Sequence, residues 1–154
     1  FSITQADAAR LRRGMSVMER DDPGAAAAIR ARAIDYARQI EADFPGDFAA
    51  GAITDNVEWR DWFYDRHQGL ACPALGPESG ACLIHEFRPV CCRLYGPLIQ
   101  IGAEQSGPCP LNYEGLTHAE IEQRAVTIDL PAMREPAGAE TMIVFALLPS
   151  ADRD

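Results

Sequence analysis

The sequence predicts a mainly α fold, a small helical domain that carries an irregular cysteine-rich segment. Three observations predict it. Apolar residues recur at helical spacing near the N-terminus, four alanines in a row favour helix at positions 25–28, and all five cysteines fall between Cys72 and Cys109, among many prolines and glycines. A chain of 154 residues is long enough for one hydrophobic core, so we expect a single domain over 1–154. Its expected parts are a helical scaffold (1–68), the cysteine segment (69–113) and a C-terminal helix with an apolar stretch (114–154).

Two helices are expected first, packed as an antiparallel pair. Thr4 is suited to cap the first helix, with Asp7 three residues on. Asp22 is the expected cap of the second helix, Pro23 suits its first turn, and the Pro-Gly pair at 45–46 should end it. The apolar stripe of the first helix is Ala8, Leu11, Met15 and Met18.

A third helix is expected from Asp55 to His67. Trp59, Trp62 and Phe63 give it an aromatic face just before the first cysteine. We interpret this face as core. A second role, shielding a nearby cysteine site from water, is compatible with the first.

Beyond the third helix the patterns are weaker. Residues 72–113 indicate irregular structure with short helical turns. Thr117 and Glu120 form a capping-box pattern for a further short helix. The apolar run TMIVFALLP, at 141–149, is either a strand or a buried helix, since periodicity alone does not separate the two.

Charge and hydropathy narrow the classes of function. The net charge is −9, and all 14 basic residues are arginines. Nothing forms a basic patch that could neutralise phosphates, so we expect neither nucleic acid nor an anionic membrane as a partner. No apolar run approaches the roughly 20 residues that span a bilayer, and no signal peptide is visible, so we expect a cytoplasmic protein. The chain begins at Phe1, which leaves a targeting segment upstream open.

The five cysteines are clustered in one quarter of the sequence. Disulfide frameworks usually spread their cysteines, so this clustering favours a metal site over disulfides, which remain an alternative. Cys72 and Cys109 each precede a proline, which biases them toward an extended backbone. Pro89 suits the first position of a short helix, PVCCRLYG, whose first turn would hold Cys91 and Cys92. A helix N-terminus and a neighbouring arginine both favour the thiolate, which is the form that binds metal.

The segments CPAL, CLIHEFRPVCCRLYGPL and GPCPLN resemble the YkgJ-type cysteine-cluster proteins, a family of zinc- or iron-chelating domains. The resemblance implies a metal site for Zn or Fe, with an iron–sulfur cluster as a further form. The implied metal ligands are Cys72, Cys82, Cys92 and Cys109. Arg88, Pro89 and Arg93 match the Arg-Pro and Cys-Arg pairs of the family pattern. The two arginines would offset the charge of four thiolates.

Three departures from the family pattern follow. Cys91 stands where the family usually has another residue type. Successive helical residues point about 100° apart, so we expect Cys91 to be a spare that packs as a small buried hydrophobe. His85 stands where tyrosine is typical and is a weak candidate ligand. The N-terminal cysteine motif of the family is absent here, and any such cysteines would lie upstream of Phe1.

Two other classes of function remain open. An enzyme, or an accessory protein of a modification or redox pathway, could use the same cluster, and the resemblance extends to the cluster of flagellin lysine N-methylase. However, the sequence has no Gly-rich cofactor loop and no HExxH motif. A thiol redox protein would instead hold no metal and contain at least one disulfide. The pattern indicates no particular protein partner.

Overall fold

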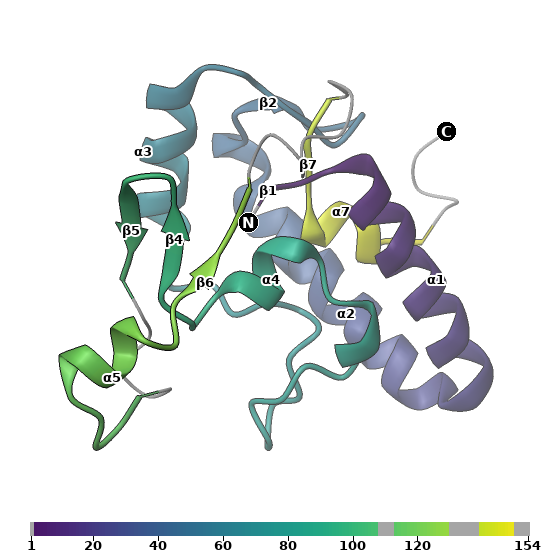
Figure 1. Ribbon diagram of the computed structural model, residues 1–154. Helices are drawn as coiled ribbons and strands as arrows, with labels where there is room; N and C mark the ends of the chain where they lie inside the picture. The colour runs from purple at the N-terminus through teal and green to yellow at the C-terminus, as the bar shows by residue number, and fades with distance from the viewer. Residues whose placement is uncertain (1, 108–112, 130–138, 150–154) are drawn as a thin grey trace. The chain divides into compact units, whose positions relative to one another are not determined.

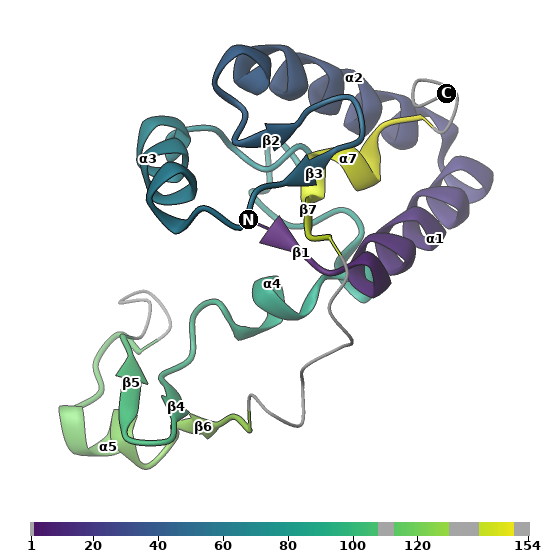
Figure 2. The same cartoon turned by 90° about the horizontal axis from the view of Figure 1, so that it is seen from above.

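The computed structural model describes residues 2–107, 113–129 and 139–149 (Figures 1 and 2). The chain forms two compact units, which are described separately. The first contains residues 2–89 and 139–149, and the second contains the described residues from 90 to 129. The mainly α fold is confirmed, with small sheets between the helices.

The helices of the first unit are α1 (Gln5–Asp21), α2 (Pro23–Ile40), α3 (Val57–His67) and α7 (Ile143–Leu147), with 3₁₀ turns η1 (Glu41–Asp43) and η2 (His85–Phe87). The caps of α1 and α2 are those expected. Thr4 Oγ1 accepts a hydrogen bond from the amide of Asp7 at 3.2 Å, and Asp22 Oδ1 accepts one from Ala25 at 2.9 Å. Side-chain caps of this kind satisfy amides that the helix itself leaves unpaired.

The core of the first unit lies where α1, α2 and α7 pack against one another (Figures 1 and 2). Ala8, Ile29, Ala33 and Leu147 are fully buried there. The small alanines allow the helices to approach closely. The apolar run at 141–149 is both a strand and a helix: β7 (Thr141–Met142) pairs with β1 (Ser2–Ile3), and α7 follows directly. A second short pair joins β2 (Gly46–Asp47) to β3 (Ala52–Ile53).

The aromatic face expected on α3 is not a core face. Phe63 is fully buried, and its ring centroid lies 6.0 Å from that of Phe44. Trp59 and Trp62 are 44% and 49% exposed. The helix begins at Val57, directly after its N-cap Asn56, and Phe63 is its buried residue. The prediction that both tryptophans are core is therefore wrong, because Phe63 alone of these three aromatic residues is buried.

The second unit contains a small sheet that the sequence did not indicate. Its strands are β5 (Glu104–Ser106), β4 (Ile99–Ile101) and β6 (Val126–Thr127), in that order, with helices α4 (Val90–Leu94) and α5 (His118–Glu122). β4 pairs antiparallel with β5 and parallel with β6. The predicted capping box of α5 is present, with Thr117 Oγ1 accepting from the Glu120 amide and the Glu120 carboxylate accepting from the Thr117 amide.

Among the described residues, no helix combines the length and the apolar character needed to cross a membrane.

Candidate metal centre

Cys72 and Cys82 belong to one closed loop of the first unit. The amide of Leu75 donates to the carbonyl of Cys72 at 3.0 Å, which makes a tight turn. Leu75 then pairs with Cys82 in an isolated antiparallel bridge. A turn spans less than about 7 Å and a bridged pair about 5 Å, so the two cysteine Cα atoms lie within about 12 Å. One turn and one bridged pair thus connect two cysteines that are ten positions apart.

Helix α2 holds this loop in place. Arg32 Nε donates a hydrogen bond to the carbonyl of Pro73, the residue after Cys72, at 2.9 Å. Tyr36 lies one helical turn further on. Its burial, and secondarily the charge of the Cys72 thiolate, raise the pKa of the Tyr36 hydroxyl. Tyr36 therefore stays neutral beside the cysteine.

A pocket of about 280 Å³ lies against the same cysteine, between α2 and the loop. Arg32, Tyr36 and Gln39 line it from the helix, and Leu70, Cys72 and Pro77 line it from the loop. Cys72 is half-buried rather than enclosed by core side chains. One side of the cysteine is therefore accessible to a small ligand or ion.

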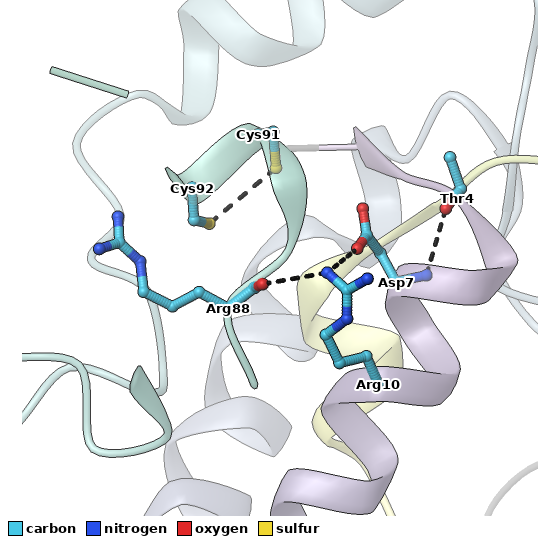
Figure 3. Close-up of polar contacts among 6 residues, drawn as sticks. All are labelled: Thr4, Asp7, Arg10, Arg88, Cys91 and Cys92. Carbon is cyan, nitrogen blue, oxygen red and sulfur yellow. Dashed lines mark hydrogen bonds and ion pairs between the residues drawn. The ribbon is translucent and has the colours of Figure 1, made fainter. Parts of the chain in front are cut away.

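Helix α1 holds the segment that leads to the next cysteines. Asp7 is buried and pairs with Arg10 at 3.0 Å, and Arg10 Nη1 lies 3.5 Å from the carbonyl of Arg88 (Figure 3). One turn further along α1, Gly14 leaves room for the ring of Phe87. A Cβ atom at Gly14 would lie only 2.7 Å from Phe87 Cγ. Two contacts thus fix residues 87 and 88 on α1.

His85 contacts Arg88 within the same unit. His85 Nε2 lies 3.3 Å from Arg88 Nη1. A guanidinium only donates, so a hydrogen bond between these two atoms requires Nε2 to be the acceptor. The arrangement gives His85 a polar partner and leaves Nε2 engaged, which weakens its candidacy as a metal ligand.

Cys91 and Cys92 lie in the short helix α4 of the second unit. The predicted helix is present, and it begins at Val90, directly after Pro89. Both cysteines are half-buried, so Cys91 is not the fully buried hydrophobe that we expected. Their sulfur atoms are 3.9 Å apart and point toward one another (Figure 3).

The predicted ligands are distributed as follows. Cys72 and Cys82 share the loop of the first unit, Cys92 lies in the second, and Cys109 lies outside the described residues. Within the described part of either unit, no group of three or more His, Cys, Asp or Glu side chains is already arranged around a common point.

Comparisons with known proteins identify the family. The sequence model of one family, "CxxCxxCC: Putative zinc- or iron-chelating domain", matches residues 4–114. No curated protein and no solved structure matches the chain. The match covers α1, α2 and α3 as well as every cysteine, so the helical part is included in the family domain. The resemblance seen in the sequence is confirmed, and the chain belongs to the CxxCxxCC family of zinc- or iron-chelating domains.

Proposed function

We propose that this protein holds Zn²⁺ or iron through the thiolates of Cys72, Cys82, Cys92 and Cys109. All four residues fall within the stretch that matches the chelating family. The observation that carries the proposal is the loop in which a turn and a β-bridge connect Cys72 to Cys82 through Leu75. Such a loop supplies two ligands at a small cost in chain entropy when metal binds.

The chemistry of the donors fits the proposed metals. Cys72, Cys82 and Cys92 are half-buried, so their sulfur atoms are not sealed in the core. Thiolates suit Zn²⁺, iron and iron–sulfur clusters alike. Zinc would make the site structural, whereas iron or an iron–sulfur cluster would also permit electron transfer.

The charge of the site requires cations nearby. Four thiolates around a divalent ion leave a net charge of −2, in a chain that already carries −9. We assign the compensating role to Arg88 and Arg93, which flank the cysteines of α4 in sequence. His85 supports this role by binding the guanidinium of Arg88 at 3.3 Å.

We also propose a cytoplasmic location, because reducing surroundings keep thiols available for metal.

Elemental analysis of anaerobically purified protein tests the proposal. We expect zinc or iron in a fixed ratio to protein, and acid-labile sulfide in addition if the iron is in a cluster. Absence of both metals from protein prepared and reconstituted under reducing conditions would refute the proposal.

Individual ligands are tested by Cys72→Ser with Ala71→Ser as its matched control. Ala71 is exposed and adjoins Cys72, so its replacement adds the same hydroxyl without removing a thiol. We expect Cys72→Ser to lower the metal content strongly and Ala71→Ser to leave it unchanged. Equal metal contents in the two variants would remove Cys72 from the site.

A further inference from the structure

The two adjacent cysteines of α4 have a sulfur spacing that suits a shared metal ion. The Sγ atoms of Cys91 and Cys92 are 3.9 Å apart (Figure 3). Two thiolates bound to one tetrahedral zinc, each at about 2.3 Å, are about 3.8 Å apart. Iron–thiolate sites also fall in the all-sulfur tetrahedral class, so the same reasoning applies to them. The observed spacing therefore agrees with a bidentate site.

The short distance between the two Cα atoms disfavours a disulfide between the two residues. A disulfide requires sulfurs about 2.05 Å apart and Cα atoms usually 4.4 to 6.8 Å apart. Adjacent Cα atoms across a trans peptide are about 3.8 Å apart, and the described chain contains no cis peptide bond. Oxidation of this pair would have to distort α4, whereas metal binding would not.

We propose that Cys91 and Cys92 bind one soft metal ion together, so that Cys91 is a ligand and not a spare. This inference rests on the proposed function, since it concerns the same metal. A shared ion removes the objection that successive helical side chains diverge, because the two side chains converge at their sulfurs. A tetrahedral ion accepts four sulfurs, so with Cys91 and Cys92 both bound, one of Cys72, Cys82 and Cys109 in the proposed ligand set would stay outside the shell.

Cobalt(II), titrated anaerobically into metal-free protein, tests the inference. Cobalt replaces zinc in tetrahedral thiolate sites, and its sulfur-to-metal charge-transfer absorption grows with the number of bound thiolates. The variants are Cys91→Ala, Cys92→Ala and Val90→Ala. Val90→Ala is the matched control, since it alters the same helix and keeps both thiols.

We expect Cys91→Ala and Cys92→Ala each to lose charge-transfer intensity per bound cobalt. Loss of an outer-shell partner costs about 10- to 100-fold in metal affinity, so loss of a direct ligand should cost about 100-fold or more. Val90→Ala should retain the wild-type spectrum. Circular dichroism of each metal-free variant verifies that the helices are intact.

The outcomes separate the shared cysteine site from the proposed function. If Cys91→Ala matches wild type in affinity and spectrum while Cys92→Ala loses both, Cys91 is not a ligand and the proposed function stands. If Val90→Ala loses as much affinity as Cys91→Ala, and the spectrum per bound cobalt is unchanged in both, α4 acts through packing and the shared site is refuted. If wild type binds no cobalt, both proposals fail.

Discussion

Replacement of Gly14 by alanine should destabilise the protein, although alanine is the better helix former. In the interior of α1, alanine gains about 1 kcal/mol over glycine. The new Cβ would lie 2.7 to 2.8 Å from Cβ, Cγ and Cδ2 of Phe87, a distance that real Cβ atoms do not tolerate. These atoms are close to the backbone of η2, so the ring cannot simply swing away. Overpacking of this kind costs about 1–3 kcal/mol, which outweighs the helical gain.

We therefore expect Gly14→Ala to lower the free energy of unfolding by about 1 kcal/mol, or the Tm by about 2–4 °C for a chain of this size. Gly24→Ala in α2 is the matched control. Its Cβ would meet only Asp22 Oδ1, at an ordinary 3.5 Å, so it should be neutral or stabilising. In a Phe87→Ala background the overlaps with Cγ and Cδ2 are removed and only the 2.8 Å contact with the Cβ of residue 87 remains, so Gly14→Ala should then cost less than it does in wild type. A Gly14→Ala variant as stable as wild type would show that Phe87 does not rest on α1.

Three more results are expected. Thr4→Ala should cost about 1 kcal/mol of unfolding free energy through loss of the α1 cap, with exposed Ser16→Ala nearly neutral in the same thermal melts. A hydrogen bond from Arg66 lowers the pKa of Asp43, so this pair stabilises the folded protein above pH 3.8, the ordinary pKa of the carboxyl group, and the stabilisation is lost as the pH falls below it. Asp43→Asn should make the free energy of unfolding in urea fall less steeply with acid, and an unchanged pH dependence would contradict the assignment. Chelation of the metal should speed amide exchange at 90–107 and leave α1 and α2 protected, and uniform loss of protection would argue against separate units.

Features governed by local hydrogen bonds could be predicted from the sequence. The caps Thr4 and Asp22 and the capping box of Thr117 depend on residues three positions apart, and all three are present. The short helix around Cys91 is present for the same reason, since Pro89 sets its start.

Features that depend on distant pairing could not be predicted. The parallel pairing of β4 with β6 joins Ile99 to Val126, and strands of two or three residues carry no readable alternation. The exposure of Trp59 and Trp62 depends on which side of α3 meets Phe44, and aromatic composition does not specify it. At the site, cysteine type and spacing identified candidate ligands. The sequence did not predict the bridge that pairs Leu75 with Cys82, nor the close approach of the Cys91 and Cys92 sulfur atoms.

The distribution of buried apolar residues explains why metal loss should affect the two units differently. In the first unit α1, α2 and α7 bury a core of their own, so we expect these helices to stay folded without metal. Among its described residues the second unit buries three apolar side chains, Leu98, Ile99 and Ile128. A segment of that size with so small a core usually needs a disulfide or a metal. Cys91 and Cys92 lie within it, in α4, so metal bound there would supply stability that its apolar core does not provide.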